Sequence, residues 1–219
     1  RWDTNTATST ECASRYWFRN VNGNTNKYIK IDWIYICKQG NNDGYDFDEF
    51  ATFIHTVFRY NEPHGNVYSF ISDWLARDQG HNPDTHSLPY ICEPLPIINQ
   101  DLRSELSIPT NAKVFGCYGG STEFNIATVY EVIKDVVNER SDIYFIFMNI
   151  NKFCDDHDQI KHLPGTYEML YKSKFVNTCD AMIHARSGGE TFGLAVAEFA
   201  TNNKPVITYK LSDEANHIE

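Results

Sequence analysis

The largest group of residues suited to binding a ligand lies between residues 186 and 198, which read RSGGETFGLAVAE. Two adjacent glycines precede Glu190, and Gly193 opens a predicted helix that also contains Glu198. Glycines let a ligand approach the backbone closely. The amides at a helix start favour an anion, because the helix dipole lies behind them. The segment therefore predicts a binding site for an anionic ligand. The alternative is a glycine-rich turn with two solvated acids.

A second glycine turn follows the apolar segment 113–118. Gly119 and Gly120 stand between this predicted strand and a predicted helix. A strand that ends in glycines before a helix is suited to face a phosphate, because its backbone amides are accessible. A plain tight turn explains the same residues.

A third cluster contains residue types that bind metals. Residues 154–158 read CDDHD, and His162 follows; His81 and His86 form a smaller group of this kind. His157 and His162 are five residues apart, which would not place them on one helix face. Zinc prefers tetrahedral ligand sets, so a solvated acidic loop fits better and we expect no metal site.

The elements that must position these residues alternate regularly in the second half of the chain. Residues 143–148 are apolar throughout, as a strand buried on both faces of a parallel sheet requires. Residues 125–140 carry apolar side chains at helical spacing. The predicted strands are 113–118, 143–148, 181–185 and 205–209, and the predicted helices are 125–140, 167–177 and 192–201. This order predicts an α/β fold with a doubly wound parallel sheet.

Ligands of such sheets bind beyond the carboxyl ends of the strands. The rule directs attention to the loops after Tyr118, Met148 and Ala185. Two of these loops contain the glycine turns described above, so we expect both turns to lie at one edge of the sheet.

The first half of the chain is less regular. We predict strands at 32–37, 51–58 and 68–71, and a helix after Ser72 that this serine caps. Residues 1–30 are polar and have no clear periodicity. Residues 86–98 contain Pro89, Pro94 and Pro96, which keep this segment extended. We expect it to join two domains, residues 1–95 and residues 96–219.

Charge and composition exclude several classes of function. The chain has 219 residues and a net charge of −10, with no basic stripe, so nucleic acid is not an expected partner. No apolar run is long enough to cross a bilayer, and no signal peptide is evident. The six cysteines, with no CxxC pair, indicate buried free thiols in a reducing compartment, so we expect a cytoplasmic protein.

The two ends of the chain resemble cuts in a longer sequence. The first residue is Arg1, and the last residues begin a predicted helix capped by Ser212. We therefore expect a fragment that is truncated at both ends.

Glu190 and Glu198, with seven residues between them, match the E-x7-E motif of retaining GT-B glycosyltransferases, most closely family GT4. Residues 191–197 resemble that family's Gly-Phe-Gly-Leu segment. Further similar segments are the entry to a strand at 177–181 and the helix, loop and Pro-Val strand at 199–207. The resemblance is good from Asp101 to Tyr209 and thinner from Asp32 to Ile98. It implies a GT-B fold with two Rossmann-like halves.

The resemblance also implies roles for individual residues. Glu190 would contact hydroxyls of the donor sugar near the reacting carbon, and Glu198 would bind the ribose of the nucleotide. His55, at the end of the second predicted strand, would lie near the donor sugar. A core histidine with one hydrogen bond is the alternative for His55, and His64 in the next loop is a rival. The implied donor-binding residues are Gly119, Gly120, Arg186, Gly189, Thr191, Phe192, Gly193, Leu194 and Glu198.

The implied activity is transfer of a sugar from a UDP- or GDP-sugar to the hydroxyl of an unknown acceptor, without a metal or another cofactor. The sequence departs from the family at the diphosphate. Cys117 stands where the family usually has arginine, and no lysine follows until Lys134, so Arg186 or another lysine would have to neutralise the phosphates. A non-catalytic nucleotide-sugar-binding module, or an inactive remnant, is therefore a second hypothesis. A GT-B epimerase is a third.

Overall fold

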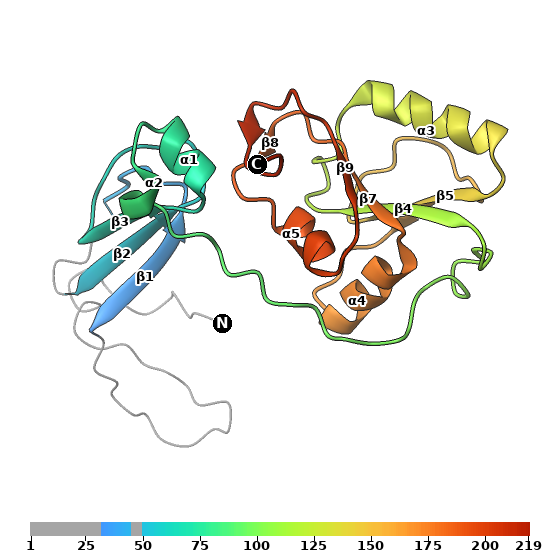
Figure 1. The fold of residues 1–219 in the computed structure, drawn as a ribbon, viewed down its shortest axis with the longest axis horizontal. Helices are drawn as coiled ribbons and strands as arrows, with labels where there is room; N and C mark the ends of the chain where they lie inside the picture. The colour runs from blue at the N-terminus through green and yellow to red at the C-terminus, as the bar shows by residue number, and fades with distance from the viewer. Residues whose placement is uncertain (1–31, 45–49) are drawn as a thin grey trace, which may run out of the picture. The chain divides into compact units, whose positions relative to one another are not determined.

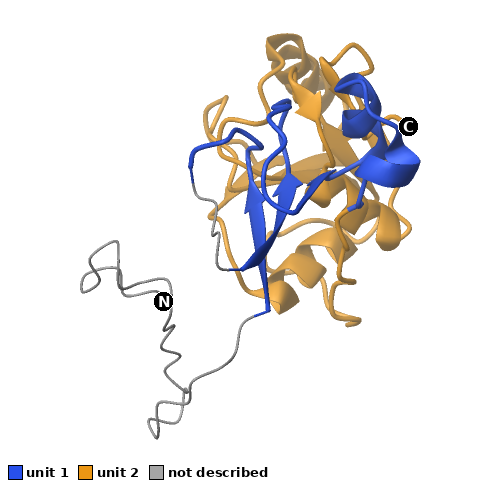
Figure 2. Cartoon of the chain, turned by 90° about the vertical axis from the view of Figure 1, so that its left-hand side faces the viewer, with its two compact units in different colours: residues 1–89 blue, residues 90–219 orange. Residues whose placement is uncertain are grey.

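The computed structural model describes residues 32–44 and 50–219. The chain forms two compact units, residues 1–89 and residues 90–219 (Figure 2). The boundary predicted from the sequence, after residue 95, lies in the same proline-rich segment. Cys12 and the unassigned residues 1–30 lie outside the described residues.

Unit 1 contains a parallel sheet with the strand order β1-β2-β3 (Figure 1). Its strands are β1 (Trp33–Lys38), β2 (Ala51–Thr56) and β3 (Val67–Phe70). Two short helices follow, α1 (Asp73–Asp78) and α2 (Pro83–His86). All three predicted strands of this half are therefore present in the structure.

Both helices in the described part of unit 1 begin at side-chain caps. The hydroxyl of Ser72 accepts a hydrogen bond from the amide of Leu75 at 3.1 Å, which confirms the predicted cap of α1. Helix α2 was not predicted. It begins at the cap residue Asn82 and has Pro83 in its first turn, where proline loses no helical hydrogen bond.

The main sheet of unit 2 is parallel throughout and has the strand order β6-β5-β4-β7-β9 (Figure 1). The strands are β4 (Lys113–Tyr118), β5 (Ile143–Met148), β6 (Ile160–Leu163), β7 (Ala181–His184) and β9 (Val206–Thr208). Four of these strands were predicted, and β6 was not.

Three helices cover this sheet. Helix α3 (Ala127–Glu139) lies on one face, and α4 (Met169–Thr178) and α5 (Leu194–Thr201) lie on the other (Figure 1). From β4 the chain passes through α3 to β5, and after β6 it returns through α4 to β7 on the other side of β4. Right-handed crossovers in opposite directions place their helices on opposite faces. The predicted doubly wound sheet is confirmed, and its strand order reverses between β4 and β7.

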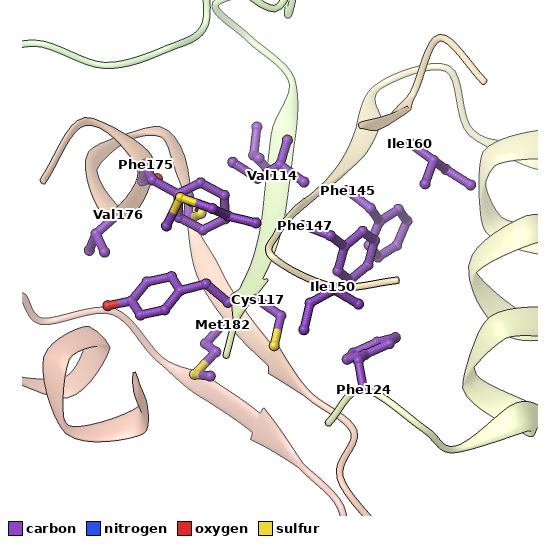
Figure 3. Packing of buried hydrophobic residues seen from close by; sticks show 14 of the residues in the cluster. Val114, Cys117, Phe124, Phe145, Phe147, Ile150, Ile160, Phe175, Val176 and Met182 are labelled. Atoms are coloured by element: carbon purple, nitrogen blue, oxygen red, sulfur yellow. Dashed lines mark hydrogen bonds between the residues drawn. The ribbon is translucent and has the colours of Figure 1, made fainter. Parts of the chain in front are cut away.

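The core of unit 2 fills both faces of the sheet (Figure 3). Phe145 and Phe147 of β5 are buried towards α3, and Phe175 of α4 is fully buried on the opposite side. Gly116 in β4 lets α4 approach, because a Cβ there would lie 2.3 Å from the Sγ of Cys179. Dense packing of this kind leaves no room for an added methyl group.

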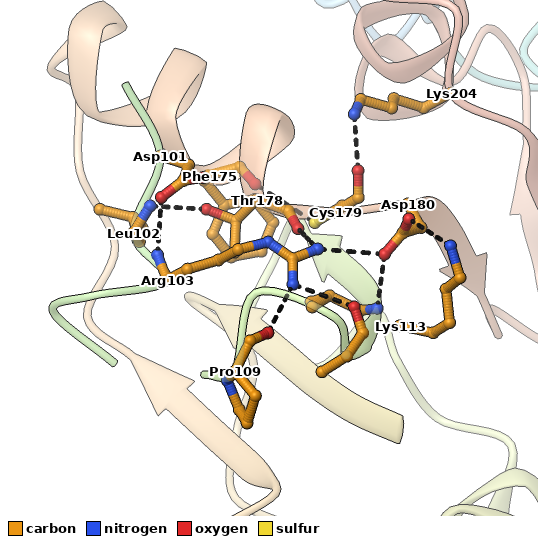
Figure 4. Close-up of polar contacts among 12 residues, drawn as sticks. Asp101, Leu102, Arg103, Pro109, Lys113, Phe175, Thr178, Cys179, Asp180 and Lys204 are labelled. Atoms are coloured by element: carbon orange, nitrogen blue, oxygen red, sulfur yellow. Dashed lines mark hydrogen bonds and ion pairs between the residues drawn. The ribbon is translucent and has the colours of Figure 1, made fainter. Parts of the chain in front are cut away.

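Asp180 and Arg103 join the start of the sheet to the segment before it (Figure 4). Arg103 donates to the carbonyls of Pro109 and Ala112 and to the carboxylate of Asp180 at 3.2 Å. Asp180 also accepts from the amide of Val114 at 2.9 Å. One carboxylate thus connects β4, β7 and the segment that leads into the sheet.

We expect Asp180→Ala to lower the free energy of unfolding at neutral pH by about 1–3 kcal/mol, because Arg103 and the Val114 amide lose an ionised acceptor. Burial raises the pKa of Asp180, but the hydrogen bonds from Val114 and Lys113 and the charge of Arg103 hold it below its ordinary value of 3.8. A lowered pKa in the folded state contributes stability above the unfolded value, and this contribution is lost as the pH falls through the folded value.

Urea unfolding of both proteins at a series of pH values measures this contribution. The difference between the wild type and Asp180→Ala should shrink as the pH falls below 3.8. A difference that stayed constant down to pH values near 2 would contradict an ionic role for Asp180.

The predicted helix after Ser212 is wrong. Instead, β10 (Glu214–Ala215) forms a short parallel pair with β8 (Gly189–Glu190). The amide of Glu214 donates to the carbonyl of Gly188 at 2.9 Å, and the Ser212 hydroxyl donates to the carbonyl of Tyr209 at 2.8 Å. The segment therefore satisfies its backbone groups against the loop that carries Glu190 rather than within a helical turn.

The prediction that the cysteines are buried is correct for only part of the set. Cys117 and Cys179 are buried, but Cys37 is exposed. Cys37 shares a face of β1 with Trp33, which is 60% exposed, so the residues that the structure describes do not bury this face. The free thiols among the described residues are Cys37, Cys92, Cys117, Cys154 and Cys179. Within the described ranges, no helix has the length and apolar character that crossing a membrane requires.

Candidate functional site

The carboxyl ends of β4 and β7 are neighbours at the point where the strand order of the sheet reverses. Ligands of open α/β sheets bind at such a point. Asn125 connects the two loops that leave these strands. Its amide donates to the carbonyl of Ala185 at 2.9 Å, and its side-chain oxygen accepts from the amide of Ser187 at 2.8 Å. The two predicted glycine turns thus belong to one connected loop region.

The loop after β5 joins the same region. The side-chain amide of Asn149 donates to the carbonyl of Gly119 at 2.6 Å, and the amide of Asn151 donates to the carbonyl of Ser121 at 2.8 Å. Asn149 has a left-handed backbone, with φ of 60°, which asparagine tolerates better than most residues. Neither Asn125 nor Asn149 was predicted as a site residue, although asparagine directly after a buried strand, as at Asn149, is a usable signal.

Two basic side chains hold the carboxylate of Glu190. His184 Nε2 lies 3.1 Å from Oε1, and Arg186 Nη1 donates to Oε2 at 2.8 Å. The backbone of Glu190 is held as well, because its carbonyl accepts from the amide of Asn216 at 3.1 Å. The Glu190 side chain is 19% exposed, so it is not fully enclosed by the protein.

Glu190 is an ionised acceptor at neutral pH. Burial raises the pKa of this carboxyl, but the hydrogen bond from His184 and the charge of Arg186 outweigh burial and bring the pKa below its ordinary value. An ionised carboxylate accepts hydrogen bonds and donates none. Glu190 is therefore suited to bind hydroxyl groups and not to supply a proton.

Gly189 and Gly193 have structural reasons to be glycine. Both have left-handed backbones, with φ of 75° and 85°. A Cβ on Gly189 would lie 1.8 Å from the carbonyl oxygen of Glu214, and a Cβ on Gly193 would lie 3.2 Å from the Glu190 side chain. Pairing with β10 and the sharp turn into α5 thus account for both glycines without a ligand.

Neither Gly119 nor Gly188 has a structural reason of this kind to be glycine. Neither has a left-handed backbone, and a Cβ on either residue would have no neighbour within 4 Å. They follow β4 and β7, the two strands at which the strand order reverses. The fold therefore has room for a Cβ at both positions, so open space is available there for a ligand to approach the backbone.

The first turn of α5 has no side-chain cap. Gly193 is its cap residue and offers no side chain to the first amides, which in a helix have no intrahelical partner. Phe192 before it is held by Asn216, whose side chain donates to the Phe192 carbonyl at 2.8 Å. Thr191 is buried and Leu194 is exposed. The helix dipole makes this turn favourable for an anion.

Glu198 is buried, and both of its oxygens have partners. Lys172 donates to Oε1 at 2.6 Å, and the hydroxyl of Tyr118 donates to Oε2 at 2.7 Å. The Lys172 ammonium also lies 5.0 Å from the centre of the Tyr118 ring. Burial and the adjacent Glu198 raise the pKa of Tyr118, which keeps this phenol protonated as the donor. Lys172 is a lysine that sequence reasoning missed, because nothing in its neighbours marks it.

The sequence predicts too little positive charge to neutralise the phosphates of a donor. The surroundings of Cys117, Lys134 and Arg186 in the structure bear on this prediction. Burial raises the pKa of Cys117 to about 12, so the thiol is neutral. Lys134 lies on α3 and pairs with Glu131 at 2.9 Å. Arg186 forms ion pairs with Glu123 and Glu190. Its guanidinium charge is thus shared between two carboxylates.

His55 lies in unit 1, buried in β2, and both of its ring nitrogens have partners. Nε2 lies 2.8 Å from the carbonyl oxygen of Leu88, and Nδ1 contacts the Tyr35 hydroxyl. Burial lowers the pKa of His55, so the neutral ring is favoured. The rival His64 is also buried, with Nδ1 2.7 Å from the carbonyl oxygen of Glu62. This arrangement fits the alternative in which His55 is a hydrogen-bonded core residue.

A cavity of about 640 Å³ lies elsewhere in unit 2, between α3 and the loop after β5. Its lining includes Lys134, Lys152, Cys154 and His157, and none of the predicted donor-binding residues. Lys152 forms an ion pair with Asp156 across this loop. In the part of the chain that the structure describes, no group of three or more potential ligands is arranged to hold a metal ion.

A scan of the sequence against protein-family models gives no match, and no curated protein matches it. Solved structures do match the fold. TarM has a TM-score of 0.50 at 11% identity, with 74% of this chain and 37% of TarM covered. An S. aureus TarM mutant in complex with fondaparinux, α-GlcNAc-glycerol and UDP has a TM-score of 0.52 at 10% identity, with 75% of this chain and 38% of that chain covered.

Anabaena HepE in complex with UDP and glucose is a further match, with a TM-score of 0.48 at 15% identity over 67% of this chain and 45% of HepE. These neighbours are GT-B glycosyltransferases. The likeness to TarM, at such low identity, shows the fold alone: an α/β architecture of the GT-B type. The chain spans less than two fifths of the length of TarM.

Proposed function

We propose that this chain carries the donor-binding half of a retaining glycosyltransferase. The reaction is transfer of a sugar from a nucleotide-diphosphate sugar to an acceptor hydroxyl. The observation that carries this proposal is the meeting of two loops at the reversal of strand order between β4 and β7. One loop holds Gly119, and the other holds Gly188, the ionised Glu190 and the uncapped start of α5.

The proposed contacts follow from the chemistry of these groups. The amides around Phe192, Gly193 and Leu194 hold the diphosphate or the sugar, because a helix start stabilises negative charge. Glu190 accepts hydrogen bonds from the sugar hydroxyls through the lone pairs that His184 and Arg186 leave unused. The leaving phosphate takes the proton of the acceptor hydroxyl, so Glu190 orients the donor.

Glu198 is the proposed contact of the ribose. Each of its oxygens has one protein donor, and a carboxylate offers about four acceptor positions. The Glu198 side chain is 5% exposed, so a ribose contact requires the side chains that surround this carboxylate to move. The role of His55 near the donor sugar stays a prediction, since both of its nitrogens are occupied within unit 1.

One observation favours a non-catalytic nucleotide-sugar-binding module as the second candidate. A departing diphosphate needs positive charge in the transition state. Of the cations at the motif, Arg186 is already paired with Glu123 and Glu190, and Lys172 is paired with Glu198, while Cys117 is neutral. Under this alternative the chain binds a sugar donor and does not turn it over.

Binding and turnover of the donor by the full chain test the proposal. UDP-, GDP- and ADP-sugars are compared by thermal shift, and hydrolysis of the binding donor is then measured. A donor present at about 100 times its Kd should stabilise the chain by about 2.7 kcal/mol, and slow hydrolysis should follow. Binding without hydrolysis would favour the module, and the absence of a shift with every nucleotide would contradict both candidates.

Gly119→Ala and Gly188→Ala locate the donor in the same assay. A Cβ at either position has no neighbour within 4 Å, so the unliganded melting temperature should stay the same or rise slightly. Donor affinity should fall at least about tenfold, which corresponds to about 1.4 kcal/mol. Wild-type affinity in both variants would place the donor away from these two turns.

A further inference from the structure

His184 is a buried histidine with a hydrogen-bond partner on each ring nitrogen. It ends β7, and its side chain is 5% exposed. Nδ1 lies 2.9 Å from the hydroxyl oxygen of Thr208 in β9, and Nε2 lies 3.1 Å from Oε1 of Glu190. The ring also packs against the ring of His217, with 4.8 Å between centroids. The imidazole therefore connects the sheet directly to the motif carboxylate.

The partners determine where the protons lie. Glu190 is ionised and can only accept, so Nε2 of His184 carries a proton and donates it. In the neutral ring, Nδ1 is then an acceptor, and the hydroxyl of Thr208 donates to it. The contact with Thr208 thus favours the tautomer in which Nε2 carries the proton and can donate it to Glu190.

Arg186 alone does not fix the orientation of the Glu190 carboxylate. Its Nη1 reaches only Oε2, and its Nε is engaged by Glu123. The arginine side chain is 24% exposed and long, whereas His184 has two side-chain torsions and is enclosed by the sheet. A donor on each oxygen is needed to define the plane of the carboxylate, and His184 supplies the buried one.

We propose that His184 is a positioning residue, which holds the Glu190 carboxylate in the orientation that receives the hydroxyls of the donor sugar. This inference rests on the proposed function, because it assigns a sugar contact to Glu190. The nucleotide and its phosphates are assigned to other groups, so loss of His184 affects recognition of the sugar and leaves recognition of the nucleotide intact.

Two substitutions separate this role from a general role in folding. His184→Gln keeps a donor at the distance of Nε2, whereas His184→Asn has a shorter side chain that can reach Thr208 but not Glu190. In the full chain, the affinities for UDP and UDP-glucose, and for GDP and GDP-mannose, are measured by calorimetry. Donor turnover and the melting temperature are measured alongside. Thr208→Val, which removes the partner of Nδ1, is a third variant.

The affinity advantage of the sugar is the Kd of the free diphosphate divided by the Kd of the sugar nucleotide. For His184→Asn we expect this ratio to fall about tenfold, as loss of one charge-assisted hydrogen bond implies. Turnover should fall by a similar factor, with wild-type affinity for the free diphosphate. His184→Gln should recover most of both losses, and Thr208→Val should show a smaller loss of the same kind.

The inference is overturned if His184→Asn keeps the full advantage of the sugar nucleotide. It is also overturned if both His184 variants lose affinity for the free diphosphate in parallel with their melting temperature, since that pattern indicates a structural role alone. A third outcome is distinguishable from these two. If the wild-type chain binds none of the four nucleotides, the proposed function is contradicted, and this inference with it.

Discussion

Glu190→Ala is expected to lower donor turnover by about a hundredfold or more, while the affinity for the free nucleotide diphosphate stays close to that of the wild type. The carboxylate is held by His184 and Arg186 before any ligand arrives. A pre-oriented group of this kind contributes most in the transition state, and its removal typically costs about 10²–10³ in rate. Steady-state kinetics of donor hydrolysis or transfer, together with calorimetry of the free diphosphate, measure the two effects.

A control for this prediction is Glu131→Ala. Glu131 is an exposed carboxylate on α3 that pairs with Lys134, so its removal changes the net charge equally without touching the motif loop. Turnover of this control should stay within about twofold of the wild type, as is usual for surface substitutions. If Glu190→Ala retained comparable activity, the assignment of the sugar contact to Glu190 would be refuted.

Glu198→Ala is expected to destabilise the fold by about 3–5 kcal/mol and to weaken nucleotide binding. The Glu198 side chain is 5% exposed and Lys172 is 16% exposed, so the substitution leaves an ammonium group with no counter-charge in a poorly hydrated site. Tyr118 loses its acceptor at the same time. Chemical unfolding followed by circular dichroism measures the stability, and nucleotide affinity is compared well below the unfolding transition.

The matched variants are Glu198→Gln, Lys172→Met and their combination. If the ion pair is buried in solution, the double variant should be more stable than Glu198→Gln alone, because no unpaired charge remains. Nucleotide binding should stay weak in both, since the ribose loses its carboxylate. An unfolding midpoint of Glu198→Ala equal to that of the wild type would show that Glu198 is exposed, contrary to the structure.

Patterns within one element predicted the α/β sheet of unit 2 well. Residues 143–148 are apolar without interruption, and they form β5 with the predicted bounds. Residues 125–140 have a one-faced apolar pattern, and α3 occupies 127–139. In both elements the side chains that determine the structure are neighbours along the chain, so the sequence alone contains the information.

The elements that were missed depend on contacts between distant residues. β6 has only four residues and includes Lys161 and His162, so no apolar run marks it; it is a strand because it pairs with β5 at the edge of the sheet. The segment after Ser212 has the local signal of a helix start. Pairing of Glu214 with Gly189 replaced that helix, and this pairing cannot be read from neighbouring residues.

The same limit applies to the site. The spacing of Glu190 and Glu198 was visible in the sequence, and both carboxylates have several polar partners in the structure. His184 and Lys172 could not be found in this way. Each depends on a contact with a residue far along the chain, Thr208 for His184 and Glu198 for Lys172.

Gly119 and Gly188 have a consequence for the way such a chain changes over evolutionary time. The fold leaves space for a methyl group at both positions, so packing within the fold does not select against alanine there, whereas a bound donor would. In a lineage that had stopped binding donors, these two glycines would drift to other residues, whereas Gly189 and Gly193 would be retained by the fold. Divergence between the two pairs of glycines would therefore distinguish descendants that still bind a sugar donor from those that have lost it.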